Sequence, residues 1–437
     1  MKKILVFGAG KSATSLIEYL CLACEKHNWA LLLCDADLAL AQSKIAGCKN
    51  AGVIAIDAAN EVDRKNLVRE ADIVISMLPP HLHFLVATDC LNFSKHLLTA
   101  SYIDEKIKAL SKEIEQKGLL FLCEMGLDPG IDHMSAMKII NQVKKDGGHI
   151  TTFKSHCGGL VSPASDDNPW HYKITWNPAN IVMAGSSGAI YRSNGNTLEI
   201  PYAAVFSDCK IVDIPVLFPL ASYPNRDSLS YIDTYGLQDI DTFIRTTLRY
   251  PSFCRGWNRI VNMGLTDTND HADIQHCKTY RDWYFEKSKS TLMPFQTKAD
   301  EEEFSQQIDY LGLQRNTPIK IEITSSASIL QHSLEEKLAM HPHDKDMIVM
   351  LHEIGYGLNG VYKLIRSSLV VMGEDEKKTA MAKTVGLPLG IAAVLVLQNK
   401  IKLTGLHIPV LPEIYIPVLS ELEDHQIKFN EEIIVRE

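Results

Sequence analysis

A glycine-rich turn directly after the first apolar run constrains the fold of this chain more than any other feature. The run Ile4–Gly8 leads into Gly8-Ala9-Gly10-Lys11-Ser12-Ala13, which matches the pattern GxGxxA, and Ser12–Lys26 then has helical spacing of apolar residues. In such a unit the first glycine allows a tight turn, the second lets backbone approach a pyrophosphate, and the small last residue permits close helix–strand packing. The helix N-terminus supplies amide donors to the phosphates. The turn therefore predicts a dinucleotide site that includes Gly8, Gly10, Lys11, Ser12 and Ala13.

Short apolar runs alternate with amphipathic stretches through the first 130 residues. Their near-continuous hydrophobicity is typical of strands buried on both faces of a parallel sheet. After the first run they are Ala30–Cys34, Gly52–Asp57, Asp72–Leu78, His96–Ala100 and Gly118–Cys123, with Leu38–Ala46 among the helical stretches. This alternation predicts an α/β fold, with a doubly wound Rossmann dinucleotide-binding domain over residues 1–130.

The character of the chain changes after about residue 130, and residues 131–380 predict a second, α+β domain for substrate binding and dimerisation. Residues 150–216 are rich in Gly, Ser, Thr, Asn and aromatics, which favours an antiparallel sheet with long loops. A charged region at about 235–315, with Ile240–Arg249 and Ala299–Tyr310, predicts a helical subdomain.

Three later segments complete the expected fold. Strand-like runs return at Ile319–Thr324 and Asp346–Leu351. Leu387–Leu397 is apolar with small residues, which fits a helix packed on a sheet. We expect residues 381–437 to return to the Rossmann domain.

Composition excludes several kinds of partner. The formal net charge of −9 gives no basic surface for nucleic acid or an anionic membrane. No uninterrupted apolar run reaches the roughly 18 residues of a membrane span, and the short apolar N-terminus lacks a signal-peptide cleavage site. We therefore expect a cytoplasmic protein whose anionic ligands are bound by a few local cations.

Cysteines and histidines at short spacing give no clear metal or disulfide pattern. Ten cysteines in 437 residues do not suggest a disulfide scaffold, and Cys21 with Cys24 is typical of core packing on a helix. His81 with His83, and His341 with His343, lack a third ligand and are expected on solvated loops. No metal site is predicted.

Acidic residues at the ends of the predicted strands refine the cofactor prediction. Asp35 follows the second strand, where a carboxylate accepts hydrogen bonds from the adenosine ribose hydroxyls and disfavours a 2′-phosphate. Asp35 therefore favours NAD over NADP, although Asp37 competes for the role. Asp57 ends the third strand and Leu78-Pro79 the fourth, so these residues are further candidates for contacts to the cofactor; a turn-forming role is the alternative for Asp57.

Three polar stretches follow strands and carry a resemblance to a known family. They contain Ser101-Tyr102-Ile103, GLDPGIDH at 126–133 and CGGL at 157–160. With DNP at 167–169, YPNRDS at 223–228, TLRYPSF at 247–253 and MAKTVGLPLGIAA at 381–393, the chain resembles the L-glutamate-forming saccharopine dehydrogenases, also called saccharopine reductases, over almost its whole length.

The resemblance implies an oxidoreductase of lysine metabolism that acts on a CH–NH bond. The implied reaction is oxidation of saccharopine, with water, to L-glutamate and 2-aminoadipate 6-semialdehyde, or the reverse, with NAD or NADP. It also implies a homodimer through the sheet of the second domain. Two alternatives remain: a reductase joining another amine and carbonyl, such as a carboxynorspermidine-type enzyme, and a non-catalytic nucleotide-binding relative.

The resemblance assigns roles to residues of the three stretches. Tyr102, Asp128 and Cys157 are implied for proton transfer. Because saccharopine has three carboxylates and a guanidinium binds a carboxylate bidentately, Arg226 and Arg249 are the preferred clamps. Ser101, Tyr102, Asp128 and Lys173 complete the implied substrate contacts, and Arg245 is a weaker candidate. Asp128 or Asp132 could instead cap the helix expected near Ile131, and Cys157 could be a buried core side chain.

Overall fold

The computed structural model describes residues 1–215, 217–289 and 294–436, and the chain divides into two units. Unit 1 consists of Met1–Asp146 with Lys377–Phe429, and unit 2 of Gly147–Glu376 with the segment from Asn430 onward. The segment Lys377–Phe429 therefore belongs to the same unit as the Rossmann sheet. The boundaries differ from the prediction, because residues 131–146 belong to unit 1 and the last strand belongs to unit 2.

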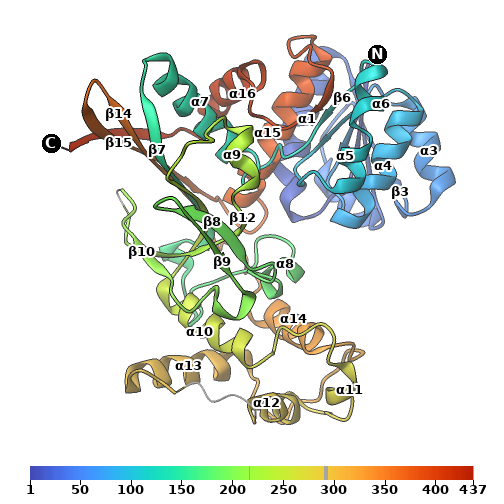
Figure 1. Ribbon diagram of the computed structural model, residues 1–437. Helices are drawn as coiled ribbons and strands as arrows, with labels where there is room; N and C mark the ends of the chain where they lie inside the picture. The colour runs from blue at the N-terminus through green and yellow to red at the C-terminus, as the bar shows by residue number, and fades with distance from the viewer. Residues whose placement is uncertain (216, 290–293, 437) are drawn as a thin grey trace. The chain divides into compact units, whose positions relative to one another are not determined.

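Unit 1 is built on a seven-stranded parallel sheet in the order β16-β6-β5-β4-β1-β2-β3 (Figure 1). The strands are β1 (Lys3–Phe7), β2 (Ala30–Asp35), β3 (Ala51–Ala55), β4 (Ile73–Ser76), β5 (His96–Thr99), β6 (Leu120–Leu122) and β16 (Gly405–His407). The first six have the doubly wound order, and the strand order reverses between β1 and β4, where such folds bind dinucleotides. The predicted Rossmann fold is confirmed, and β16 extends it by one strand.

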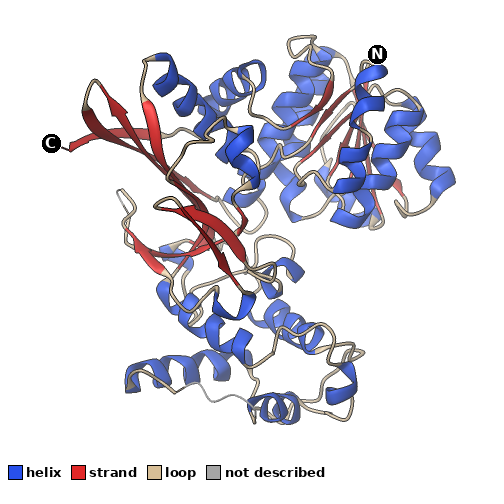
Figure 2. Cartoon of the chain, viewed as in Figure 1, coloured by secondary structure: helices blue, strands red, loops and turns tan. Residues whose placement is uncertain are grey.

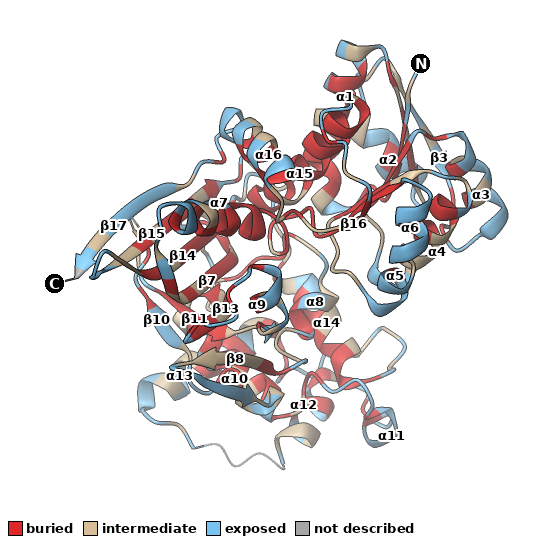
Figure 3. Ribbon diagram, turned by 45° about the horizontal axis from the view of Figure 1, so that its top comes forward, coloured by how far each residue is buried: buried red, intermediate tan, exposed pale blue. Residues whose placement is uncertain are grey.

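The helices of unit 1 pack on this sheet or on one another. They are α1 (Thr14–His27), α2 (Leu38–Lys44), α3 (Glu61–Glu70), α4 (Pro80–Asn92), α5 (Glu105–Ala109), α6 (Ser111–Gln116), α7 (Ile131–Lys145), α15 (Ala380–Leu397) and α16 (Pro412–Asp424). The inner strands β1 and β4 are almost completely buried, as near-continuous hydrophobicity predicts. Most of helix α15 is likewise buried (Figure 3).

Helix α15 brings the C-terminal segment onto the helix of the glycine-rich turn. Two of its glycines permit this, because a Cβ on Gly386 would meet the backbone nitrogen of Leu16 at 2.7 Å and one on Gly390 would meet the Tyr19 ring at 2.6 Å. α15 is 18 residues long and, by length and composition alone, apolar enough to cross a membrane, which the sequence analysis did not anticipate. However, 89% of it is buried inside the unit, as expected for a core helix.

Unit 2 contains a ten-stranded mixed sheet whose main path is β10-β11-β13-β7-β14-β15-β17 (Figure 2). These strands are β10 (Lys210–Val212), β11 (Leu220–Pro224), β13 (Thr242–Arg249), β7 (His149–Val161), β14 (Asp346–Leu358), β15 (Val361–Met372) and β17 (Asn430–Arg436). Beside it lie β8 (Ala189–Ser193), β9 (Asn196–Ile200) and β12 (Arg226–Asp227). The parallel pair β13–β7 places Thr247 opposite Cys157.

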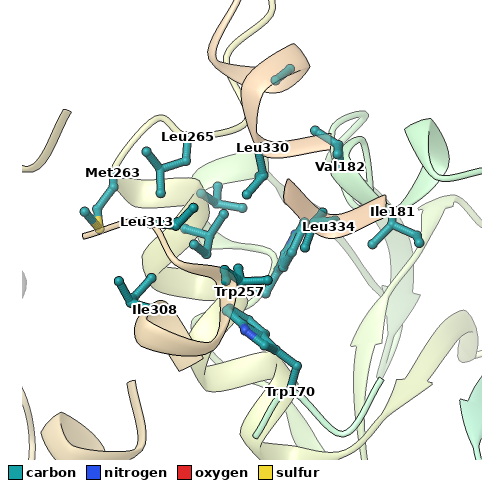
Figure 4. Close-up of a cluster of buried hydrophobic side chains, with 14 of the residues drawn as sticks. Trp170, Ile181, Val182, Trp257, Met263, Leu265, Ile308, Leu313, Leu330 and Leu334 are labelled. Atoms are coloured by element: carbon teal, nitrogen blue, oxygen red, sulfur yellow. The ribbon is translucent and has the colours of Figure 1, made fainter. Parts of the chain in front are cut away.

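A helical subdomain within unit 2 has its own aromatic core. Its helices are α8 (Ala179–Val182), α10 (Pro251–Asn262), α11 (His271–Ile274), α12 (Tyr280–Ser288), α13 (Lys298–Leu311) and α14 (Ser326–Lys337). The short helix α9 (Ser230–Thr234) belongs to another part of unit 2. Trp170 and Trp257 are fully buried there among aliphatic side chains such as Ile308 and Leu334 (Figure 4). The Trp170 indole donates to the Gln307 carbonyl at 3.0 Å, so its polar edge is satisfied.

Two segments were predicted wrongly. Ile240–Arg249, expected to be helical, contains strand β13, because tertiary pairing with β7 and β11 overrides the local charge pattern. Ile319–Thr324 was expected to form a strand, but its backbone is irregular and an isolated bridge contact lies just before it. Ile319 and Ile323 pack on the aromatic core instead. Periodicity alone does not distinguish these cases.

The cysteine prediction also needs correction at one site. Cys21 forms a disulfide with Cys48, 27 residues away, and joins α1 to the segment after α2. Cys24, the other member of the pair, is a buried free thiol, as expected for core packing. Sequence alone gave no reason to pair Cys21 with Cys48, because both lie in helical or turn segments with no recognisable disulfide spacing.

Candidate active site

The glycine-rich turn has the backbone geometry that dinucleotide binding requires. Gly8 follows β1 with φ of +101°, and a Cβ there would meet the Met77 carbonyl oxygen at 2.7 Å, so only glycine fits. A Cβ on Gly10 would meet nothing within 4 Å, which leaves the backbone open to a phosphate. Lys11-Ser12-Ala13 form a 3-10 turn that leads into α1. The residues of the turn therefore fit a dinucleotide at the helix N-terminus.

Asp35 lies at the end of β2 and holds this turn in place. One of its carboxylate oxygens accepts a hydrogen bond from the Ala9 amide at 2.7 Å, and the other accepts from the Asp37 amide at 2.9 Å. Each carboxylate oxygen has a second lone pair, so the group can still accept from a ribose hydroxyl. Asp37, the competing residue, is the N-cap of α2 and accepts from the Leu40 amide.

The other cofactor candidates lie at strand ends of the same sheet. Asp57 is exposed and its carboxylate accepts from the Ala59 amide at 2.9 Å, so it forms the turn before α3, which is the alternative left open by the sequence. Leu78 and Pro79 follow β4, and Pro79 is the N-cap of α4. Leu78 packs against the core of the sheet.

Tyr102 and Asp128 meet in unit 1 on two neighbouring loops. Tyr102 follows β5, Asp128 follows β6, and the Tyr102 hydroxyl donates to an Asp128 carboxylate oxygen at 3.5 Å, which is long for such a bond. Both side chains are half-buried. The structure therefore brings together two of the three residues implied for proton transfer.

The GLDPGIDH loop that carries Asp128 is fixed by buried polar groups. Asp128 is linked to Pro129 by a cis peptide bond, and Gly126 donates from its amide to the Pro129 carbonyl at 2.9 Å. Gly130 is the N-cap of α7, and the Asp132 carboxylate accepts from its amide at 2.6 Å. Asp132 therefore accepts a hydrogen bond from a backbone amide at the start of α7. The sequence left this role open between Asp132 and Asp128.

A buried pair on the next turn supports the Tyr102 loop. Glu124, with φ of +57°, accepts from His133 Nε2 at 2.9 Å and from the Ile103 amide at 3.3 Å. The Glu124 amide in turn donates to the Ser101 carbonyl at 3.1 Å. These bonds connect the loop after β5 to the loop after β6, so the positions of Tyr102 and Asp128 depend on each other.

Arg249 is the central cation of unit 2. Its side chain is buried, and its Nη1 donates to the carbonyls of Leu248 at 2.9 Å and Gly159 at 3.4 Å. The guanidinium also stacks over the rings of Tyr172 and Phe253, with centroid distances of 5.2 and 5.7 Å. Its Nε is buried without a hydrogen-bond acceptor among the described residues.

Phenol and thiol groups lie around this guanidinium. Burial by itself lowers the pKa of Arg249, but Tyr223, Tyr172, Cys254 and Cys157 together raise it above its usual value. Burial also raises the pKa of Tyr223 to about 12, so this phenol stays protonated at neutral pH. Cys157 therefore lies near Arg249, as the pairing of β7 with β13 requires.

The remaining predicted cations of unit 2 differ in their surroundings. The buried Lys173 ammonium donates to Asp167 at 2.8 Å and to Asp344 at 2.7 Å, so two carboxylates of the protein already occupy it. Arg226 is exposed on β12 with φ of +52°. Arg245 is buried and stacks on Tyr231 at 4.5 Å. A substrate carboxylate would therefore compete with Asp167 and Asp344 for Lys173.

Sequence reasoning missed two groups near the predicted residues. His83 was expected on a solvated loop, but it is buried and contacts Ser76 and Ser101. Tyr172 and Tyr223 contribute to the surroundings of Arg249. For His83, the helical spacing of Leu82, Val86 and Ala87 could have indicated a helix with a buried apolar face. In the described ranges no group of three or more His, Cys, Asp or Glu could hold a metal ion.

Two family models match the chain. Residues 4–122 match the saccharopine dehydrogenase NADP binding domain, and residues 126–427 match the saccharopine dehydrogenase C-terminal domain. The two matches meet at the start of the GLDPGIDH loop. Together they cover both units and every candidate site residue.

Curated and solved relatives agree with these matches. The chain is 31% identical to a saccharopine dehydrogenase [NADP(+), L-glutamate-forming] of Saccharomyces cerevisiae, over 97% of each chain. It is 32% identical to an alpha-aminoadipic semialdehyde synthase of Arabidopsis thaliana over 93% of its own length, but spans only 41% of that protein. The solved apo structure of the yeast L-glutamate-forming saccharopine dehydrogenase superposes with a TM-score of 0.87 at 29% identity, covering 99% of this chain and 100% of that one.

Proposed function

This chain belongs to the saccharopine dehydrogenase family, and we propose that it oxidises saccharopine with NAD(P)⁺ and water to L-glutamate and 2-aminoadipate 6-semialdehyde. Its membership makes it an oxidoreductase with an NAD(P)-binding domain. The specific substrate, the direction of the reaction and the roles of individual residues are part of the proposal. The reverse reductive condensation follows from the same chemistry when metabolite ratios favour it.

The observation that carries the choice of substrate is the buried guanidinium of Arg249. A buried charge is costly unless a counter-charge or hydrogen bonds compensate it, and here the described residues leave Nε without an acceptor. A substrate carboxylate would supply both the charge and the acceptor. Saccharopine has three carboxylates, and the exposed Arg226 is a second proposed clamp for one of them.

In the proposed reaction a bound dinucleotide supplies the hydride acceptor. The secondary amine of saccharopine loses a hydride from the carbon that becomes the aldehyde, and the resulting substrate imine is hydrated and cleaved to release glutamate. The chain must accept a proton from the amine, activate water and return a proton to the leaving amine.

Tyr102 and Asp128 are the proposed proton-transfer pair of unit 1. Asp128 accepts a hydrogen bond from the Tyr102 hydroxyl, so a proton can pass between this pair and a substrate nitrogen or a water molecule. In unit 2 we propose that Cys157, near Arg249, also takes part in proton transfer. Ser101, beside Tyr102, is proposed to contact the substrate.

We propose that Asp35 makes NAD the preferred cofactor. The carboxylate would accept from the ribose hydroxyls and repel a 2′-phosphate. The curated yeast relative is named for NADP(+), so this preference would distinguish the present chain from that enzyme. A cofactor comparison tests it independently of the substrate.

A spectrophotometric assay tests the function. Purified protein is mixed with saccharopine and either NAD⁺ or NADP⁺ at several pH values, absorbance at 340 nm is followed, and glutamate is quantified. We expect saccharopine-dependent reduction with one glutamate per reduced cofactor, faster with NAD⁺. Absence of reduction with both cofactors would contradict the function, and activity with NADP⁺ alone would contradict only the interpretation of Asp35.

The homodimer and the cytoplasmic location remain proposals. β17 forms one edge of the unit 2 sheet and exposes Ile433 and Val435, which is compatible with association through this sheet. Light scattering coupled to size-exclusion chromatography would give the mass of the particle in solution. A fluorescent fusion would test the location.

A further inference from the structure

His83 occupies an unusual position between two serine hydroxyls of unit 1. It lies in the first turn of α4 and is only 3% exposed. Its Nδ1 is 2.8 Å from Ser76 Oγ, and its Nε2 is 2.6 Å from Ser101 Oγ. Both ring nitrogens therefore have a hydroxyl partner, and the imidazole bridges two separate strand ends.

The imidazole is uncharged under ordinary conditions. Burial lowers the pKa of His83 to about 4, and Asp104 and His81 act on it in opposite directions. A neutral imidazole donates from one nitrogen and accepts at the other. One serine hydroxyl must therefore donate to the ring while the other accepts from it, so the bridge has a defined polarity and fixes both hydroxyls.

The two serines belong to the two parts of unit 1 that the proposed reaction uses. Ser76 is the last residue of β4 and pairs with Phe7, the residue directly before Gly8 of the dinucleotide turn. Ser101 directly precedes Tyr102, and its amide donates to Thr99 Oγ1 at 3.2 Å. His83 thus ties the strand end beside the dinucleotide turn to the loop that carries Tyr102.

We propose that His83 is a positioning residue for the proposed oxidation: through Ser101 it holds the Tyr102 hydroxyl against Asp128. This inference rests on the proposed function. The bond from Tyr102 to Asp128 is 3.5 Å long, so a small shift of the Tyr102 loop breaks it. Because proton transfer needs donor and acceptor within hydrogen-bond reach, loss of the bridge lowers turnover more than substrate affinity.

Substitutions of His83 separate its two contacts. Glutamine places a polar atom near the position of Nε2 and keeps the contact to Ser101, whereas asparagine mimics Nδ1 and keeps the contact to Ser76. Leucine keeps the approximate volume and removes both. Ser101→Ala removes the proposed link without changing His83, and His81→Gln, an exposed histidine two residues away, is the matched control.

The measured quantities are kcat and KM for saccharopine, their pH profiles, and the Kd for NADH from fluorescence titration. We expect kcat of His83→Leu to fall about tenfold or more, with KM and the NADH Kd changed less than about twofold. His83→Gln should recover most of kcat, His83→Asn should not, and His81→Gln should match the wild type. The pH profile of kcat should shift in His83→Leu, because the contact between Tyr102 and Asp128 is altered.

Several results overturn the inference. A wild-type kcat in folded His83→Leu contradicts it. Equal recovery of kcat in His83→Asn and His83→Gln does so too, as does a loss of activity that is explained entirely by a weaker NADH Kd. If His83→Leu does not fold, His83→Gln and Ser101→Ala decide: a wild-type kcat in Ser101→Ala contradicts the link. An inactive wild-type protein that still binds NADH overturns the proposed function and this inference together, whereas an active wild type with unaffected variants overturns only the inference.

Discussion

Two buried arginines, one in each unit, show how differently this chain treats a buried cation. Arg64 of unit 1 donates from Nε to Asp89 at 2.6 Å and from Nη1 to the Ala58 carbonyl at 2.7 Å. Arg249 of unit 2 has carbonyl and aromatic partners but no carboxylate among the described residues, and its Nε has no acceptor.

The difference separates a structural charge from one available to a ligand. A buried ion pair such as Arg64–Asp89 is complete, and removal of one partner leaves the other charge buried and uncompensated. Arg249 instead retains the charge and the donor that a substrate carboxylate requires, at a cost in stability that the proposed function explains. Substitutions of Arg249, Arg64 and Lys173 test whether burial with or without a carboxylate partner distinguishes the two roles.

The largest expected effect on catalysis belongs to Arg249. Arg249→Met should reduce kcat/KM for saccharopine by roughly 100-fold or more, about 2.7 kcal/mol or more, because a buried charge-assisted contact is lost. The melting temperature should stay equal or rise, since an uncompensated buried cation is removed. Steady-state kinetics and thermal unfolding on the same preparations check both, and Arg249→Lys controls for charge without the guanidinium fork. A large loss of stability with unchanged kcat/KM would make Arg249 structural.

Arg64 should behave in the opposite way. Arg64→Met leaves Asp89 buried and unpaired, so the free energy of unfolding should fall by about 3–5 kcal/mol. The double variant Arg64→Met/Asp89→Leu should recover much of that loss, because neither charge remains. Denaturant unfolding measures the stabilities, and kcat/KM of the folded protein should change little. A selective loss of kcat/KM without loss of stability would erase the distinction between the two arginines.

Lys173 is a third buried cation and should resemble Arg64 on a smaller scale. Lys173→Met should cost about 2 kcal/mol, less than a fully buried pair because Asp167 is 57% exposed. Burial raises the pKa of Asp167, but the hydrogen bond and charge of the Lys173 ammonium lower it by more. The pKa of Asp167 therefore lies below its usual value. This contribution to stability is therefore present above the unfolded pKa of about 4 and is lost as pH falls from that value through the lower pKa of the folded state.

Unfolding experiments at several pH values check the Lys173 prediction. The stability difference between wild type and Lys173→Met should narrow as pH falls from 6 towards 3. Lys154→Met, a change to a partly exposed lysine of β7, serves as a control. A difference that stays constant with pH, or a large rise in KM for saccharopine, would show that Lys173 does not act through Asp167.

The smallest effect is expected at Asp35, where a carboxylate is placed to exclude an anion. Asp35→Asn keeps an oxygen acceptor for the Ala9 amide but removes the negative charge, so the preference for NAD⁺ over NADP⁺ should fall by about tenfold. The ratio of kcat/KM for the two cofactors measures this. Asp37→Asn, at the neighbouring helix cap, should leave the ratio unchanged. An unchanged ratio in Asp35→Asn would show that another group selects the cofactor.

The sequence predicts unit 1 well because its signals are local. The glycine turn, the buried strands and the helix after them appear in their order along the chain, and β1, β2 and β5 begin within a residue of the predicted positions. The addition of β16 and the packing of Gly386 on Leu16 could not be predicted, because these contacts join residues more than 280 positions apart.

In unit 2 the local signals misled where pairing partners decide the structure. The segment containing Arg245 and Arg249 has helix-compatible charges, yet it lies between β11 and β7 as strand β13. Its being a strand places Arg249 beside Gly159 and near Cys157. The family resemblance implies roles for Arg249 and Cys157, whereas Tyr172, Tyr223 and His83 emerge only when distant strands and helices are packed together.

A crystal structure of the protein with bound saccharopine is the most direct test of the role assigned to Arg249. Our account predicts a carboxylate oxygen of saccharopine within hydrogen-bond distance of Arg249 Nε, while the Arg64–Asp89 pair keeps its 2.6 Å contact. The account would be contradicted if all three substrate carboxylates bound elsewhere and Arg249 kept only its carbonyl and aromatic partners.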